Sequence, residues 1–186
     1  TGKTYAYSLP LVSKLEQDED KMKVRILIVS PTFELSSQIN SAIKLITNRK
    51  TALFIGGSPL KRQIETLKDK PQIVIGTAAR LVELIRLKKL KTNDLYAIVF
   101  DECDRLVKKE SFEDTDNLRR CVQRDCQIIA CSATTNKSTK IFFAEAQNVV
   151  LPAENILTKN ITHWAIYAEN REKIEFLRKV LAAENP

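Results

Sequence analysis

The chain has 186 residues, 44% of them hydrophobic, which fits one full α/β domain with a fragment of a second. Its 30 lysines and arginines exceed its 23 aspartates and glutamates by seven, a balance that permits a phosphate-bearing partner without requiring one. It has no run of about 18 apolar residues and no signal-peptide pattern, so neither a membrane span nor secretion is predicted. We expect an intracellular, cytoplasmic protein, with the nucleus or nucleolus as the alternative for a eukaryotic source.

Short apolar runs rich in β-branched residues alternate along the chain with segments of helical spacing. The runs predict buried strands at 24–29, 51–55, 72–75, 95–100, 127–131 and 148–151. The helical segments are 3–16, 34–46, 60–67, 80–87 and 138–146. This alternation predicts an α/β fold with right-handed crossovers, a mainly parallel sheet and ligands at the carboxyl ends of the strands.

The periodicity ends after residue 151, where Pro, Asn and Thr dominate. We therefore predict one domain over 1–151, a linker over 152–162 and the beginning of a second domain over 163–186. A strand-like run at 161–167 and a periodic helix at 171–183 support that last assignment. The four cysteines show no CxxC spacing, and the single histidine is far away in sequence, so we expect free thiols and no zinc site.

Thr1-Gly2-Lys3-Thr4 matches the end of the phosphate-binding pattern GxxxxGK[ST], directly before a predicted helix. A helix N-terminus offers free N–H groups to phosphate, the lysine reaches the β and γ phosphates, and the threonine hydroxyl can hold magnesium. Taken alone, the short match is equally well explained by chance.

The apolar run 97–100 is followed by two acids, Asp101 and Glu102. At the tip of a buried strand, Asp101 can hold magnesium through water, and Glu102 can orient or deprotonate the attacking water. The alternative is an exposed acidic turn. That alternative is weakened by the upstream Gly2-Lys3-Thr4 in the same alternating chain.

These residues together resemble the DEAD-box family of RNA helicases. Asp101-Glu102-Cys103-Asp104 resembles the DEAD motif in its DECD variant. Other motifs follow the family's order: Pro31-Thr32-Phe33-Glu34-Leu35 resembles PTREL, Gly56-Gly57 the glycine pair, Thr77-Ala78-Ala79-Arg80-Leu81 TPGRL, and Ser132-Ala133-Thr134 SAT. The resemblance covers residues 1–151 and implies a three-layer α/β/α RecA-like domain of the P-loop NTPase class, with 163–181 resembling the entry of a second RecA-like domain.

The resemblance also implies an RNA-dependent ATPase that uses ATP and Mg²⁺, binds single-stranded or short duplex RNA, and works with protein cofactors and without a membrane. It assigns catalysis to Lys3, Asp101 and Glu102, ATP binding to these and Gly2 and Thr4, magnesium to Thr4 and Asp101, coupling to Asp104, Ser132 and Thr134, and RNA binding to Pro31, Thr32, Gly57, Thr77 and Arg80. For the coupling and RNA residues, turn and helix-cap chemistry is the alternative.

Two departures from the family pattern stand out. Phe33 replaces the arginine of PTREL, and Ala78 and Ala79 replace the proline and glycine of TPGRL, so the sequence predicts RNA affinity that is reduced or reshaped. Two rival functions remain open at this point. One is another superfamily 2 motor that acts on DNA, and the other is a degenerate RNA-binding module that has lost turnover.

Overall fold

The computed structural model describes residues 2–134, 136–150 and 165–184. The chain divides into two compact units, Thr1–Ala146 and Gln147–Pro186. Within the described residues, no helix is both long enough and apolar enough to cross a bilayer.

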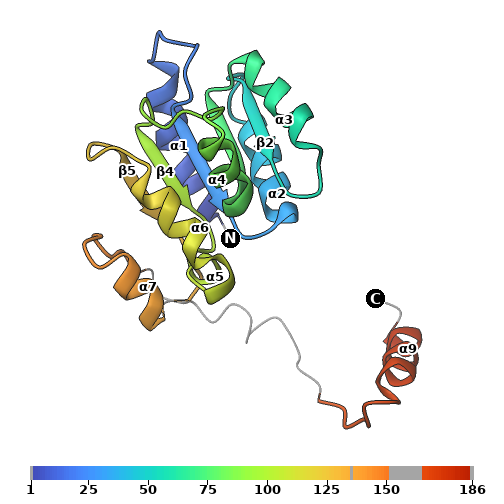
Figure 1. Ribbon diagram of the computed structural model, residues 1–186. Helices are drawn as coiled ribbons and strands as arrows, with labels where there is room; N and C mark the ends of the chain where they lie inside the picture. The colour runs from blue at the N-terminus through green and yellow to red at the C-terminus, as the bar shows by residue number, and fades with distance from the viewer. Residues whose placement is uncertain (1, 135, 151–164, 185–186) are drawn as a thin grey trace. The chain divides into compact units, whose positions relative to one another are not determined.

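A parallel sheet forms the centre of the first unit (Figure 1). Its strands are β1 (Ile26–Ser30), β2 (Thr51–Phe54), β3 (Ile73–Thr77), β4 (Ala97–Phe100) and β5 (Gln127–Ala130). They lie in the order β2-β3-β1-β4-β5, with every neighbouring pair parallel. This arrangement confirms the predicted α/β class and the parallel sheet.

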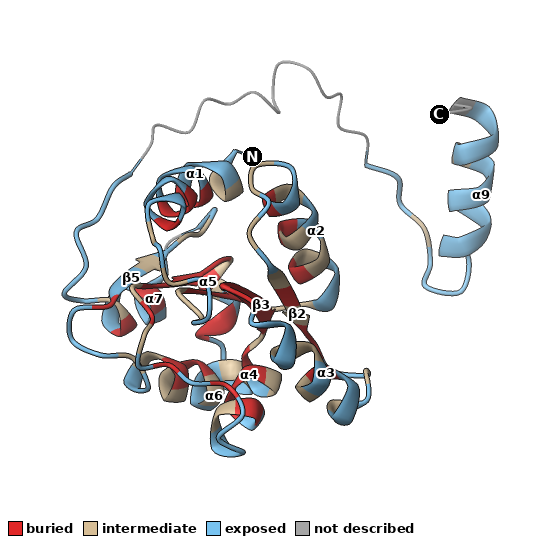
Figure 2. Cartoon of the chain, turned by 90° about the horizontal axis from the view of Figure 1, so that it is seen from above, coloured by how far each residue is buried: buried red, intermediate tan, exposed pale blue. Residues whose placement is uncertain are grey.

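Helices cover both faces of the sheet, as Figure 2 shows from above. They are α1 (Lys3–Glu16), α2 (Phe33–Lys44), α3 (Leu60–Thr66), the short 3₁₀ turn η1 (Leu67–Asp69), α4 (Ala78–Arg86), α5 (Cys103–Leu106), α6 (Lys109–Arg120) and α7 (Lys137–Phe142). Alternate residues of β1 point to opposite faces: Ile26 and Ile28 pack with α1 and α2, whereas Leu27 and Val29 pack with α4 and α6. The three layers of the predicted fold therefore result from strands that are apolar on both sides.

The register aligns the carboxyl ends of the strands. Ser30 at the end of β1 pairs with Thr77 at the end of β3, and Val29 pairs with Phe100 at the end of β4. The segments that follow the five strands consequently emerge at one edge of the sheet. We call these segments the carboxyl rim; they comprise residues 31–32, 55–59, 77–80, 101–104 and 131–134.

The prediction of a strand at 148–151 was wrong for the residues that are described. Residues 148–150 have no regular structure, and the side chains of Val149 and Val150 are exposed, so an apolar run alone did not make a strand without a pairing partner. Helices α5 and α6 were not predicted. The only large apolar side chains of α6 are Phe112 and Leu118, too few for a periodic pattern to reveal the helix.

The second unit contains α9 (Lys173–Glu184), within two residues of the helix expected at 171–183. Residues 165–169 precede it without regular structure. The expected linker at 152–162 and most of the expected strand at 161–167, including His163, lie outside the described residues. The assignment of this unit to a second RecA-like domain stays a prediction.

Candidate nucleotide and RNA site

Apart from Gly2, Lys3 and Thr4 at the start of α1, the predicted site residues lie on the carboxyl rim, and the strand order separates them into two groups. The segments after β4 and β5 carry the acids and the Ser132–Thr134 hydroxyls, whereas the segments after β2, β3 and β1 carry the residues predicted to bind RNA. Because β1 lies between β3 and β4, the two groups are neighbours along one edge. Ligands of parallel α/β sheets bind at this edge.

The predicted phosphate turn forms the start of α1. Gly2 adopts φ 82°, the left-handed region that glycine enters at little cost, and its carbonyl accepts the N–H of Ala6 at 3.0 Å. Lys3 and Thr4 are the first two residues of the helix. The first N–H groups of a helix have no partner inside it, so this end of α1 can accept an anion.

Asp101 joins α1 to the end of β4. Its side chain is buried, with 3% exposure. The Tyr7 hydroxyl donates to its Oδ2 at 3.0 Å, and the Glu102 backbone N–H donates to its Oδ1 at 2.9 Å. The carboxylate therefore has a defined orientation on both oxygens.

The charges of Lys3 and Asp101 both affect the pKa of the Cys131 thiol, in opposite directions. Burial raises the pKa of Cys131, the charge of Asp101 raises it further, and the charge of Lys3 opposes the rise. The backbone of Cys131 is bound on both sides, since its N–H donates to Phe100 and its carbonyl accepts from Cys103, each at 2.9 Å. The hydrogen bond from Tyr7 to Asp101 thus links the helix that begins at Lys3 to the acidic end of β4, and the roles of these residues in nucleotide binding stay a prediction.

Glu102 lies between β4 and α5 in a left-handed conformation, φ 47° and ψ 49°, which is uncommon for a residue other than glycine. Its carboxylate forms a 2.8 Å ion pair with Arg105, one helical turn later, and the side chain is about one-third exposed. Glu102 thus combines an uncommon backbone conformation with an accessible carboxylate, directly after Asp101 at the end of β4. Such outliers often occur at functional sites.

Asp104 is linked to the segment after β5. The Thr134 hydroxyl donates to Asp104 Oδ2 at 2.8 Å. Although partial burial opposes it, hydrogen bonding from Ser132 and Thr134 lowers the pKa of Asp104 below its usual 3.8. The contact expected between these motifs is therefore present, while its role in coupling stays a prediction. The alternative, that Ser132 or Thr134 caps the next helix, is wrong, because Asn136 caps α7 with its own side chain.

The three segments predicted to contact RNA already have internal contacts. Thr32 caps α2 by accepting the Leu35 N–H at 3.3 Å, and Thr77 precedes α4 without a capping bond from its side chain. Gly57 adopts φ 80°. The cap and turn interpretation therefore holds for Thr32, whose hydroxyl proton can still be donated to a ligand.

Arg80 is more enclosed than expected for a phosphate ligand. Its side chain is 13% exposed, its Nε forms a 3.0 Å ion pair with Glu83, and its Nη1 donates to the Ser58 carbonyl at 3.1 Å. Arg80 thus connects the start of α4 to the turn that contains Gly57. This arrangement positions that turn, whether or not the guanidinium also reaches RNA.

The two departures from the family pattern differ in their surroundings. Phe33 is the first residue of α2 and is 49% exposed, so it does not belong to the core. Ala78 is buried against the sheet, whereas Ala79 is exposed on the rim. A surface effect is therefore expected from Phe33 and Ala79 and a packing effect from Ala78.

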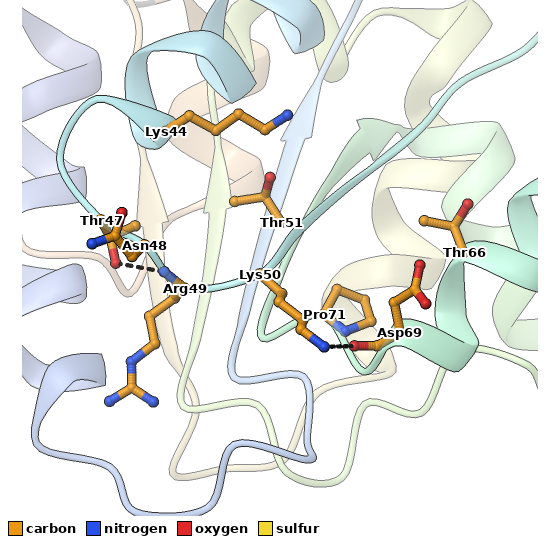
Figure 3. Close-up of a pocket in the computed structure, with 9 residues that line it drawn as sticks. All are labelled: Lys44, Thr47, Asn48, Arg49, Lys50, Thr51, Thr66, Asp69 and Pro71. Carbon is orange, nitrogen blue, oxygen red and sulfur yellow. Dashed lines mark hydrogen bonds between the residues drawn. The ribbon is translucent and has the colours of Figure 1, made fainter.

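A surface hollow lies away from the carboxyl rim, at the opposite ends of β2 and β3 (Figure 3). Its lining includes Lys44, Arg49 and Lys50. Arg49 is paired with Glu16 at 3.0 Å, and Lys50 donates to the Asp69 carbonyl at 3.0 Å. Two of its three cations are thus engaged by the protein, and no sequence motif points to the hollow.

Sequence reasoning missed Tyr7 and Arg105. Tyr7 lies on the buried stripe of α1 with Leu11 and Leu15, where a tyrosine looks like ordinary core packing. Its position one helical turn after Lys3 was the available signal, because residues i and i+4 share a helix face. Arg105 has the same kind of signal, three residues after Glu102 on a helix that was itself not predicted.

Comparison with known proteins places these motifs in a family. A model described as DEAD/DEAH box helicase matches residues 1–142. The DEAD-box ATP-dependent RNA helicase CshC of Bacillus cereus is 35% identical over 189 residues, which cover 97% of this chain and 48% of CshC. The probable ATP-dependent RNA helicase YfmL of Bacillus subtilis is 33% identical over 191 residues, covering 99% and 50%. The chain thus spans about half the length of these curated relatives.

Solved structures agree on the fold. The yeast DEAD-box splicing factor Prp28 has a TM-score of 0.72 at 22% identity, covering 77% of this chain and 36% of the Prp28 chain. A Dbp5 variant from S. cerevisiae, bound to RNA and ADP BeF3, has a TM-score of 0.66 at 20% identity, covering 78% and 37%. The family model matches 142 of the 186 residues, and that stretch contains every motif gathered at the rim, so the chain belongs to the DEAD/DEAH box helicase family.

Proposed function

We propose that this chain is the ATP-binding part of a DEAD-box RNA helicase, which couples ATP binding and hydrolysis to RNA binding and to local duplex unwinding or remodelling of RNA–protein complexes. The observation that carries the proposal is the hydrogen bond from Tyr7 to Asp101. It holds the phosphate turn of α1 against the acidic end of β4. The names of CshC and YfmL, both ATP-dependent RNA helicases, support the same activity.

In the nucleotide site, the N–H groups at the start of α1 and the Lys3 ammonium would bind the phosphates of ATP. Thr4 and Asp101 fit magnesium, because a hydroxyl and a carboxylate are hard oxygen donors and Asp101 forms no ion pair within the described residues. Bound magnesium would neutralise charge that develops on the phosphates. Glu102, accessible at the rim, would orient or deprotonate the attacking water.

RNA would bind along the neighbouring half of the rim. Thr32 and Thr77 offer hydroxyls there, and backbone N–H groups of the Gly57 turn can contact phosphate oxygens or the 2′-OH. Arg80 would act by holding that turn, and its remaining N–H groups can still reach a phosphate. The hydrogen bond between Thr134 and Asp104 would transmit the nucleotide state between the segments after β4 and β5.

For the domain organisation, we propose that 1–151 belong to the first RecA-like domain, 152–162 to a linker and 163–186 to the start of a second RecA-like domain. The parallel sheet and the division of the chain after Ala146 support the first boundary. A cytoplasmic location is favoured because the relatives named above come from Bacillus, whose cells have no nucleus.

The deciding experiment is steady-state ATP hydrolysis by the full-length protein, measured with single-stranded RNA and single-stranded DNA of equal length and composition. We expect magnesium-dependent hydrolysis that RNA stimulates and DNA does not. Equal stimulation by DNA would support a DNA-acting superfamily 2 motor. Nucleotide and RNA binding without turnover would support a degenerate binding module.

A further inference from the structure

Tyr7 contacts one of the residues proposed to hold magnesium. Its hydroxyl donates to Asp101 Oδ2 at 3.0 Å, from a position one helical turn after Lys3 on α1. We propose that Tyr7 is a positioning residue of the magnesium–nucleotide site, whose hydroxyl fixes the Asp101 carboxylate in the orientation that would hold magnesium. This inference rests on the proposed ATPase function.

Local structure places this hydroxyl. Tyr7, Leu11 and Leu15, spaced four residues apart, form a stripe of α1 that is buried against the sheet. The aromatic ring supplies packing, with 4% of the residue exposed, and the oxygen is the only part that serves Asp101. A phenylalanine at this position would keep the ring and lose the donor.

The Tyr7 hydroxyl is the donor in this hydrogen bond, because a carboxylate oxygen accepts. A neutral donor adds no negative charge beside Asp101 and leaves the carboxylate charge available to a cation.

Two donors orient Asp101, one on each oxygen. The Glu102 N–H on Oδ1 belongs to the backbone, and no side-chain substitution removes it. Of the two donors to Asp101, the Tyr7 hydroxyl on Oδ2 is the one that a side chain supplies. Its removal would leave the carboxylate free to rotate about one fixed oxygen, which should weaken magnesium binding more than nucleotide binding itself.

The test measures the dissociation constant of a fluorescent ADP analogue for the full-length protein, with saturating magnesium and with EDTA. The ratio of the two constants reports the contribution of magnesium without requiring turnover. In Tyr7→Phe we expect this ratio to shrink roughly 10-fold, the lower range for a hydrogen bond to a charged group. The affinity in EDTA should stay unchanged.

Tyr96→Phe is the matched control. The Tyr96 hydroxyl also binds α1, donating to the Leu11 carbonyl at 2.8 Å, but it lies away from Asp101 on the same face of the sheet. Its removal should lower stability without changing the magnesium ratio. In a second measurement, Tyr7→Phe is made in an Asp101→Asn background, where it should have no further effect on the ratio.

An unchanged ratio in Tyr7→Phe would overturn the inference, as would equal weakening with magnesium and with EDTA, which would indicate a purely structural role. An additional loss in the Asp101→Asn background would also contradict it. A wild-type protein whose nucleotide affinity is independent of magnesium would overturn the proposed function itself, and this inference with it.

Discussion

The Thr134 hydroxyl donates a 2.8 Å hydrogen bond to the Asp104 carboxylate, joining residues that lie 30 positions apart in the chain. β4 and β5 are adjacent and parallel, so the segments that follow them leave the sheet side by side. Asp104 lies in the one-turn helix α5, which directly follows Asp101 and Glu102. We therefore predict that a change in the proposed nucleotide site reaches Thr134 through a single short segment of backbone.

Thr134→Val removes this donor while nearly keeping the side-chain volume. We expect the pKa of Asp104 to rise towards its usual 3.8, because the hydrogen bonds to the carboxylate are what lower it. A folded-state pKa below the unfolded one stabilises the protein above the unfolded value, and this stabilisation is lost as the pH falls through the folded value. Titration of Asp104 by NMR measures the shift directly.

The same variant makes a prediction for stability. The difference in free energy of unfolding between wild type and Thr134→Val should be full above about pH 5 and should shrink as the pH falls below 3.8. Urea unfolding at neutral and acid pH measures it. A difference that stays constant across this range would show that Thr134 contributes by packing and not through Asp104.

Glu102→Gln in the full-length protein should abolish turnover while retaining ATP and RNA binding. The amide keeps nearly the same volume but cannot accept a proton, and a positioned general base typically contributes about 10² to 10⁴ in rate. Steady-state hydrolysis and nucleotide titration separate the two effects. Loss of nucleotide binding with unchanged residual turnover would contradict the role assigned to Glu102.

Arg105→Gln is the control for that substitution. It breaks the same 2.8 Å ion pair and leaves the Glu102 carboxylate in place. An ion pair this exposed contributes little to stability, so we expect both variants to unfold near the wild-type temperature. Turnover should fall far less in Arg105→Gln than in Glu102→Gln. An equal fall in both variants would show that the lost turnover comes from breaking the ion pair and not from removing the Glu102 carboxylate.

Gly76→Ala should destabilise the fold. A Cβ at this position of β3 would lie 2.2 Å from the Phe54 carbonyl oxygen of the neighbouring strand, a contact that backbone movement alone can relieve. Overpacking of this kind costs about 1 to 3 kcal/mol or more. Gly56→Ala is the matched control, because its Cβ would meet no atom within 4 Å. Thermal unfolding of the two variants should differ clearly, and similar midpoints would show that the sheet relaxes around the added methyl group.

The sequence predicted β1, β3 and β4 because these strands are apolar on both faces and appear as continuous runs. Motif order then predicted which strand ends carry the site. Helix α6 could not be predicted in this way, because its position depends on packing against α4 and on the Thr115 hydroxyl, which donates to the Leu106 carbonyl at 2.9 Å. Tertiary contacts of that kind produce no periodic pattern of apolar residues in the sequence.

The hydrogen-bond and ion-pair partners of the site side chains could not be predicted from the sequence either. The motifs placed Asp101 and Arg80 correctly on the rim, but a motif does not state what a side chain already binds. The Tyr7 contact joins residues 94 positions apart, and the ion pair of Arg80 with Glu83 competes with the phosphate role that the pattern suggested. Only the folded arrangement shows which charges on the rim remain free for a ligand.

Phe33→Arg tests the departure at the start of α2. Phe33 is 49% exposed beside Pro31 and Thr32, so an arginine there could neutralise one RNA phosphate. Each phosphate neutralised on a single strand contributes roughly 0.7 to the slope of log affinity against log salt. In the full-length protein we expect tighter RNA binding at low salt and a slope steeper by up to about 0.7. Fluorescence anisotropy over a series of salt concentrations measures both.

Leu45→Arg is the matched control, because it adds the same charge at an exposed position just beyond the other end of the same helix. It should leave the slope nearly unchanged if the gain at position 33 comes from a local phosphate contact. The competing account is that Phe33 stacks on a base, an interaction that stabilises by roughly 1 to 3 kcal/mol with little salt dependence. Under that account Phe33→Arg gains little, and Phe33→Ala weakens binding about equally at every salt concentration. Equal gains from Phe33→Arg and Leu45→Arg would mean that overall charge, and not the rim, sets RNA affinity.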